Sequence, residues 1–312
     1  MRKAAITDPI FHHEDAARAF LEDLLWPDGP VCPHCGFEGG AYKLKPRPTS
    51  KSPGRQGLYK CKKKECRKQY TVTVGTIFER SHIPLHKWLL AFHLICASKK
   101  GMSAHQLHRM LDIGYEAAWF LFHRIRHAMT EEGPFQKLRG IVEADETYVG
   151  GKRKGKQYGR GRGTKGKTIV LTLVERDGRT TSQTVERVTT DTLGSVLEEL
   201  ADPSAHLMTD ELGSYIKPGR GFAAHSTVRH SAGEYARGEV HVNTAESYFA
   251  LLKRGIAGAF HHVSRKHLHR YLAEFDFRWN HRKLDDFQRA LAALLRTPGK
   301  RLMYQKPASA EN

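Results

Sequence analysis

Two pairs of cysteines constrain the fold of this chain more than any other feature. Cys32 and Cys35 are separated by two residues, Cys61 and Cys66 by four, and 25 residues lie between the pairs. Both spacings are typical of zinc ligands, and four thiolates suit a tetrahedral Zn²⁺ ion. Such an ion supplies about 10–16 kcal/mol of folding free energy to a domain with little core of its own. We predict a small domain closed by structural Zn²⁺, the alternative being four unconnected buried cysteines.

The charge of the chain indicates a polyanionic partner. Lys and Arg number 51 and Asp and Glu number 33, which gives a net charge of +18. Such an excess favours nucleic acid, although a ribosomal or membrane-surface protein is also compatible with charge alone. The longest apolar run, residues 88–97, is interrupted by His93 and is too short to cross a bilayer. We therefore expect a cytoplasmic protein without membrane contact, where disulfides are rare and paired cysteines indicate metal.

The N-terminal part is expected to contain two domains. Residues 1–80 should hold a short amphipathic helix, the zinc-binding domain and a strand at 71–74. Residues 81–132 are helical in pattern, with one helix starting after the cap Ser103 and another starting at Tyr115. Two helices joined by a glycine-containing turn are typical of a helix-turn-helix, so this region is predicted to bind DNA.

Residues 133–297 change to strand patterns and are predicted to form one α/β domain, followed by a tail at 298–312. Because strands and helices alternate irregularly, the sheet should mix parallel and antiparallel strands. The expected strands are 140–145, 168–175, 180–188, 206–209 and 222–229. The expected helices are 193–200, 244–255, 266–279 and 285–295.

Three carboxylates are candidate metal ligands in this domain. Asp145 and Asp210 each follow an apolar strand, and strand ends gather at one edge of such a sheet, where neighbouring carboxylates repel unless a cation lies between them. Glu246 and Lys253 are seven residues apart and share a helix face. This set fits two-metal phosphoryl transfer with Mg²⁺, or Mn²⁺ in its place. The alternatives are solvated aspartates and a capping box in which Asn243 caps the helix and Glu246 reaches back.

With these motifs in view, the sequence resembles bacterial insertion-sequence transposases of the ISXO-like type, which join an N-terminal zinc ribbon to an RNase H-like Asp-Asp-Glu catalytic domain. The resemblance covers roughly residues 17–290. The matching stretches are C-P-H-C-G (32–36), C-R-K-Q-Y-T-V-T-V-G-T-I-F (66–78), A-D-E-T-Y-V-G-G-K (144–152), T-D-E (209–211), H-V-N-T-A-E-S-Y-F-A-L-L-K-R-G (241–255) and K-H-L-H-R-Y-L-A-E-F-D-F-R-W-N-H-R (266–282). Together these stretches are highly specific, although any single one is not.

The resemblance implies a fold, an activity and a set of site residues. The fold would be an RNase H-like mixed sheet preceded by a zinc ribbon and a helical DNA-binding region. The implied catalytic residues are Asp145, Asp210, Glu246 and Lys253. Some relatives place Asn in the third metal-binding role, so Asn243 remains an alternative to Glu246. Glu146 and Glu211 adjoin the two aspartates, but the alternation of side chains along a strand should turn them to the opposite face.

The implied activity is cleavage at the ends of an insertion sequence and transfer of the freed 3′ hydroxyls into target DNA. The partners would be the terminal inverted repeats and target DNA, bound by a homodimer or larger assembly. Candidate DNA contacts are two arginines of the helical region and the basic residues of a Gly-rich loop at 151–167. These residues are Arg124, Arg126, Lys152, Arg153, Lys154, Arg160, Arg162, Lys165 and Lys167. The rival functions are a nuclease or resolvase without strand transfer, and a zinc-ribbon DNA-binding regulator with an inactive site.

Overall fold

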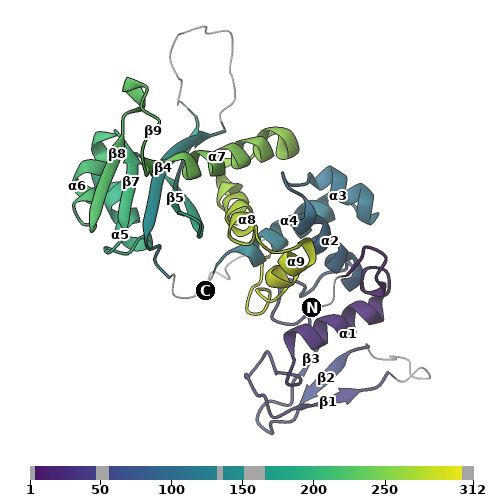
Figure 1. Ribbon diagram of the computed structural model, residues 1–312. Coiled ribbons are helices and arrows are strands. Elements are labelled where there is room, and N and C mark those ends of the chain that lie inside the picture. The colour runs from purple at the N-terminus through teal and green to yellow at the C-terminus, as the bar shows by residue number, and fades with distance from the viewer. Residues whose placement is uncertain (1–3, 47–55, 132–135, 151–165, 304–312) are drawn as a thin grey trace, which may run out of the picture. The chain divides into compact units, whose positions relative to one another are not determined.

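A computed structural model describes residues 4–46, 56–131, 136–150 and 166–303 of the chain. These residues form two compact units (Figure 1). Unit 1 consists of residues 1–129 and 284–312, and unit 2 of residues 130–283. Unit 2 is therefore inserted into the sequence of unit 1.

Unit 1 begins with helices η1 (Pro9–Phe11) and α1 (Glu14–Leu25), followed by a three-stranded antiparallel sheet. Its strands β1 (Ala41–Leu44), β2 (Leu58–Cys61) and β3 (Gln69–Tyr70) lie in that order. Tyr59 and Tyr70 pack beside the cysteines in a small core. The strand predicted at 71–74 is wrong. That segment folds into turns, closed by hydrogen bonds from Val74 N to the Thr71 carbonyl and from Thr76 N to the Thr73 carbonyl.

The remaining helices of unit 1 agree closely with the helical patterns of the sequence. They are α2 (Leu85–Ala97), α3 (Ala104–Leu111), α4 (Tyr115–Met129) and α9 (Asp286–Leu294). Ser103 caps α3 by accepting from Gln106 N at 3.1 Å, and α3 ends at Asp112, which adopts a left-handed conformation with φ 49°.

Helix α9 packs within unit 1, although the sequence analysis assigned its residues to the catalytic domain. A capping box between Asp285 and Gln288 starts it. The Phe287 ring lies 6.2 Å from that of Phe20 on α1, and Arg289 Nε donates to the Cys96 carbonyl of α2 at 3.1 Å. The apolar face of α9 therefore completes the helical core of unit 1.

Unit 2 is built on a five-stranded mixed sheet with the order β6-β5-β4-β7-β8. Its strands are β4 (Ile141–Val149), β5 (Thr168–Glu175), β6 (Thr180–Val185), β7 (His206–Asp210) and β8 (Ala224–Val228). β4, β5 and β6 are antiparallel to one another, whereas β7 runs parallel to β4 and β8 parallel to β7. This mixed sheet confirms the predicted α/β class. The β5–β6 turn contains Asp177 in a left-handed conformation, as expected for a tight hairpin.

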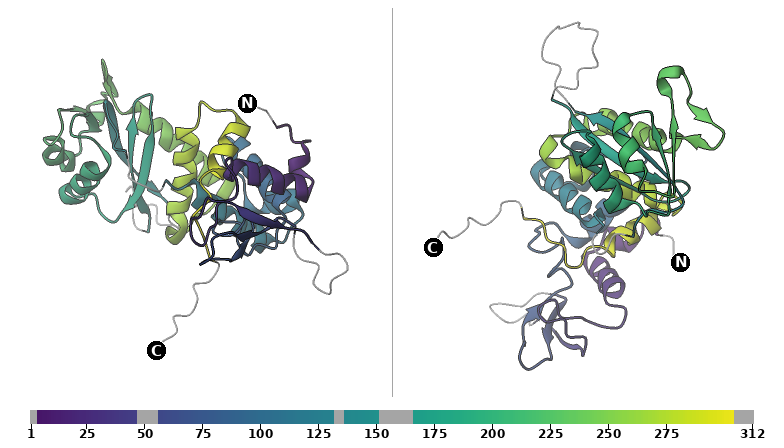
Figure 2. Two further views of the ribbon diagram at one scale, coloured as in Figure 1. Left: turned by 90° about the horizontal axis from the view of Figure 1, so that it is seen from below. Right: turned by 90° about the vertical axis from the view of Figure 1, so that its left-hand side faces the viewer.

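Helices cover both faces of the sheet (Figure 2, left). On one face, α5 (Thr190–Leu200) packs on apolar residues of β4, β5 and β7. On the other face, α7 (Asn243–Gly255) and α8 (Leu268–Asn280) pack on the C-terminal end of β4, at Val149, and on β5. Smaller elements complete unit 2: η2 (Gly213–Tyr215), α6 (Ile216–Gly219), η3 (His230–Ala232), β9 (Ala236–Arg237), β10 (Val240–His241), η4 (Ile256–Phe260) and η5 (Arg265–His267). Among the described residues, no helix is both long and apolar enough to cross a membrane.

Candidate active site

Three carboxylates meet at one end of the unit 2 sheet. Asp145 lies in β4 and Asp210 ends β7. The two strands run parallel, and their register pairs Glu143 with Met208, so the two aspartates lie at the same level on neighbouring strands. One oxygen each of Asp145, Asp210 and Glu146 lies within 4.8 Å of the other two. We call these three residues the acidic cluster.

The acidic cluster is electrostatically unfavourable without a cation. Burial, together with the charges of Glu146, Asp210 and Glu246, raises the pKa of Asp145 to about 8, although a hydrogen bond from the Glu146 amide to Asp145 Oδ1 at 2.8 Å acts in the opposite direction. Burial also raises the pKa of Glu146. Near neutral pH, Asp145 therefore holds a proton unless a cation replaces it. Carboxylate oxygens are the ligands that Mg²⁺ prefers, so the donor set fits a divalent ion.

Glu146 belongs to this cluster, contrary to the prediction that it faces away. Its Oε2 accepts a hydrogen bond from the Tyr215 hydroxyl at 2.9 Å, which shows that its side chain starts toward the α5 face, as strand alternation requires. The side chain is long enough to return its carboxylate to the end of the sheet. Glu211 does turn away, because it accepts hydrogen bonds from Ser231 N at 2.9 Å and Ser231 Oγ at 2.8 Å.

Glu246 lies in the first turn of α7, outside the group of atoms that meet within 4.8 Å. It is exposed, and its charge contributes to the raised pKa of Asp145. Lys253 is exposed on the same helix, with Nζ 5.9 Å from the centroid of the Phe249 ring. The capping-box alternative is wrong, because the N-cap is Val242, which makes no side-chain cap hydrogen bond, and Asn243 is already the first helical residue.

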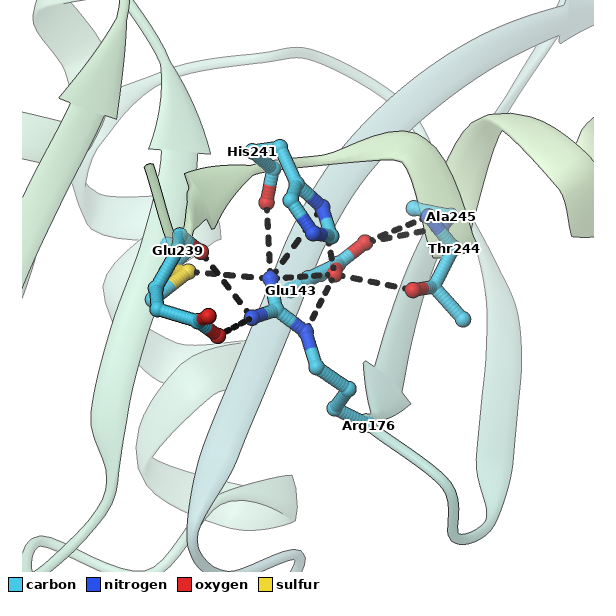
Figure 3. Close-up of polar contacts among 7 residues, drawn as sticks. Glu143, Arg176, Glu239, His241, Thr244 and Ala245 are labelled. Atoms are coloured by element: carbon cyan, nitrogen blue, oxygen red, sulfur yellow. Dashed lines mark hydrogen bonds and ion pairs between the residues drawn. The ribbon is translucent and has the colours of Figure 1, made fainter. Parts of the chain in front are cut away.

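One functional carboxylate was not predicted from the sequence: it lies in β4, against the start of α7. Glu143 is fully buried in β4 and accepts hydrogen bonds from Thr244, Ala245 and Arg176 (Figure 3). The available signal was a charged residue in the middle of the apolar stretch I-V-E-A-D, two residues before Asp145 and on the same side of the strand.

The four cysteines of unit 1 form the second candidate metal site. Their sulfur atoms all lie within 4.8 Å of one another, with Sγ–Sγ distances of 3.8 Å for Cys32–Cys66 and 3.8 Å for Cys35–Cys61. Ligands about 2.3 Å from a tetrahedral centre are about 3.8 Å apart, so the spacing fits Zn²⁺. Burial, followed by the neighbouring thiols, raises the pKa of Cys61 to about 12, so a cation is needed to stabilise its thiolate. Cys96 is buried in α2, outside this group.

The two arginines predicted to contact DNA are buried. Arg124 is 7% exposed and Arg126 is 2% exposed. Arg124 donates to the carbonyls of Ile77 at 2.9 Å and Leu302 at 3.3 Å, and Arg126 stacks over the Phe122 ring. This burial contradicts their assignment as DNA contacts, because a phosphate needs a guanidinium that solvent can reach. Of the loop residues, Lys167 is exposed before β5, whereas Lys152, Arg153, Lys154, Arg160, Arg162 and Lys165 lie outside the described residues.

Comparisons with known proteins match one family domain in each of the two units. Residues 137–280 match the family described as the ISXO2-like transposase domain, and residues 12–69 match the transposase zinc-ribbon domain. A protein of Halobacterium salinarum is 29% identical over 287 residues, which cover 86% of this chain and 91% of the relative. It is described as an uncharacterized protein in transposable element ISH50. The acidic cluster falls within the first matched region and the four cysteines within the second.

Proposed function

Since this chain belongs to the ISXO2-like transposases, with an N-terminal zinc ribbon and a DDE domain, we propose that it cleaves DNA at insertion-sequence ends and transfers the freed 3′ hydroxyls into target DNA. The observation that carries this proposal is the acidic cluster at the ends of β4 and β7. The strand order β6-β5-β4-β7-β8, with three antiparallel strands followed by two parallel ones, supports an RNase H-like catalytic domain.

Asp145 and Asp210 hold divalent metal in this proposal, and Glu246 supplies the third carboxylate. Bound Mg²⁺ would activate the attacking oxygen and stabilise the leaving one. Glu146 orients Asp145 through the hydrogen bond from its backbone amide and adds a further carboxylate beside it. Lys253, about two turns from Glu246 on the same face of α7, contributes a positive charge toward the scissile phosphate. No covalent bond between enzyme and DNA is needed, because water attacks first and the freed 3′ hydroxyl attacks second.

The zinc ribbon holds structural Zn²⁺ through Cys32, Cys35, Cys61 and Cys66, and with α2–α4 it recognises the inverted repeats. The net charge of +18 supports DNA binding. The basic residues of 151–167 add contacts to the phosphate backbone. A homodimer or larger assembly follows from the need to hold two ends together during joining.

The test is incubation of the purified protein with Mg²⁺ and DNA that carries its own element ends. Wild-type protein is expected to cleave one strand at each end and to join the ends to target DNA. Asp145→Ala and Asp210→Ala should abolish both steps while end binding stays near that of wild type, because neither change touches the ribbon or α2–α4. Cleavage that persists in both variants would exclude the two-metal mechanism.

Two further variants identify the third ligand. Glu246→Gln keeps the size of the side chain but removes its charge, and it should abolish cleavage. Asn243→Ser keeps a small polar residue at the start of the helix and should leave cleavage intact. The reverse pattern would assign the third position to Asn243.

A further inference from the structure

A buried carboxylate precedes Asp145 by two residues on the same strand. Glu143 is 0% exposed in β4, the central strand of the sheet. Because side chains alternate along a strand, Glu143 and Asp145 point to the same side, the side on which α7 begins. A buried charge is unfavourable unless hydrogen bonds and opposite charges compensate it, so the partners of Glu143 define its role.

The first partners of Glu143 are at the N-terminus of α7. Its Oε2 accepts from Thr244 N at 2.8 Å and Ala245 N at 3.1 Å, and its Oε1 accepts from Thr244 Oγ1 at 2.9 Å. The first amides of a helix have no partner within the helix, and Val242 at the N-cap provides no side-chain acceptor. Glu143 therefore caps α7 from a neighbouring strand, and its charge complements the positive end of the helix dipole.

The second partners hold the segment that leads into α7 (Figure 3). Arg176, directly after β5, donates to Glu143 Oε1 from Nε at 3.1 Å and from Nη2 at 2.8 Å. The same guanidinium donates to the carbonyls of Glu239 at 2.9 Å and His241 at 3.3 Å. His241 Nδ1 lies 3.3 Å from Glu143 Oε1. One buried group thus connects β4, the end of β5, β10 and the first turn of α7.

We propose that Glu143 is a positioning residue for the metal centre, which sets the carboxylate of Glu246 relative to those of Asp145 and Asp210. This inference rests on the proposed function. Glu246 directly follows Ala245, whose amide Glu143 binds, and Asp145 lies two residues beyond Glu143 on β4. A single side chain therefore links the backbones that carry two of the three proposed ligands. Mg²⁺ requires near-ideal octahedral geometry, so a displaced α7 would weaken its binding.

Glu143→Gln tests this role, because the amide keeps the shape of the carboxylate but lacks its charge and turns an NH₂ group toward donors. We expect Mn²⁺ binding to the DNA-free protein, measured by electron paramagnetic resonance, to weaken roughly 10- to 100-fold, as for other groups that orient metal ligands. The Mg²⁺ concentration for half-maximal cleavage should rise by a similar factor. The amides of Thr244 and Ala245 should lose protection from hydrogen exchange, while end binding stays unchanged.

Glu274→Gln is the matched control. Glu274 is also 0% exposed in unit 2 and also accepts from an arginine, Arg278, at 2.7 Å and 3.1 Å, but it lies on α8. The control removes a buried charge of the same kind and should leave Mn²⁺ affinity and the exchange of the α7 amides as in wild type. An equal loss of Mn²⁺ affinity in both variants would overturn the inference, since it would reflect general destabilisation. Wild-type Mn²⁺ affinity in Glu143→Gln would overturn it as well.

Thr244→Val decides the question if Glu143→Gln does not fold. This change removes one hydroxyl donor to Glu143 Oε1 and leaves the ion pair with Arg176 in place. A smaller shift of Mn²⁺ affinity in the same direction supports the inference, and an unchanged affinity overturns it. Absence of DNA cleavage by wild-type protein would count against the proposed function, whereas Mn²⁺ affinity and amide exchange still decide the role of Glu143.

Discussion

Asp276 of α8 is an ionisable group whose protonation is tied to folding rather than to the metal centre. Its Oδ1 accepts from the Tyr248 hydroxyl at 2.5 Å and from Ser182 Oγ at 2.8 Å, and its Oδ2 accepts from Ser182 N at 2.9 Å. These bonds join β6, α7 and α8. Burial raises the pKa of Asp276 to about 7, although the hydrogen bonds from Tyr248 and Ser182 oppose this effect.

The raised pKa of Asp276 makes the stability of unit 2 dependent on pH. The folded pKa of Asp276, about 7, lies above the ordinary value of 3.8. Its protonated form therefore contributes to the free energy of unfolding, fully below pH 4, and this contribution is lost as the pH rises toward 7. Asp276→Asn removes this titration. The free energy of unfolding of the variant relative to wild type should therefore rise by about 3 kcal/mol between pH 5 and pH 8, measured by urea denaturation.

Asp202→Asn provides the control for this prediction. Hydrogen bonds from Ser204, followed by the charge of Arg139, lower the pKa of Asp202, so it does not titrate between pH 5 and pH 8. The free energy of unfolding of Asp202→Asn relative to wild type should stay constant between pH 5 and pH 8. A constant difference for Asp276→Asn as well would show that Asp276 is ionised throughout.

Individual site residues differed in how far the sequence could predict them. Asp145 and Asp210 were predicted to converge because each follows an apolar strand, and the acidic cluster confirms their proximity. The place of Glu146 could not be predicted, because alternation fixes where a side chain starts but not where a long one ends. Glu143 was missed because nothing in the sequence shows that the first amides of α7 lie against β4.

Helices and strands were predictable where their residues pack on one core. The apolar spacing of α4 and the β-branched run of β5 gave bounds that agree with the structure. The segment 71–74 has the same alternation as a strand, but none of the strands in the described part of the chain pairs with it. Pairing with a partner strand, rather than the alternation itself, decides whether such a segment joins a sheet.

The zinc ribbon should depend on metal for its folding. Purified protein is expected to contain about one zinc per chain. Cys61→Ser removes a buried ligand, and because structural zinc contributes about 10–16 kcal/mol, residues 31–80 should unfold. Metal analysis by mass spectrometry and limited proteolysis would measure these effects. Cys96→Ser is the control, because it changes a buried cysteine outside the group of four, and this variant should keep its zinc. Full zinc retention in Cys61→Ser would refute the assignment of Cys61 as a zinc ligand.

DNA binding by the complete chain should depend strongly on salt, because its net charge is +18. Each phosphate contact contributes about −0.9 to the slope of log K against log salt concentration. Replacing Arg160, Arg162, Lys165 and Lys167 with Gln should therefore flatten the slope by up to about 3.6, which fluorescence anisotropy at several salt concentrations can measure. An unchanged slope would show that these residues do not contact DNA.

The division into two units could not be predicted from the sequence. Local patterns predicted α9 correctly as a helix, but its apolar face carries no information about which core it joins. The sequence order favoured the catalytic domain, since α9 follows α8 after a short connection. In the structure, α9 instead packs with α1 and α2. The contact between Arg289 and Cys96 of α2 spans 193 positions, and the contact between Phe287 and Phe20 of α1 spans more.

The insertion of unit 2 into unit 1 has a consequence for biosynthesis. When α4 leaves the ribosome, unit 1 still lacks α9, whose codons lie beyond all of unit 2. At about 5–20 residues per second, roughly 10 to 30 s pass before α9 is made. Unit 2 is complete in sequence before α9 emerges, so its sheet can form while α1 and α2 still expose the apolar surface that α9 covers. The nascent chain therefore passes through a period in which chaperones have a defined hydrophobic target in its N-terminal helices.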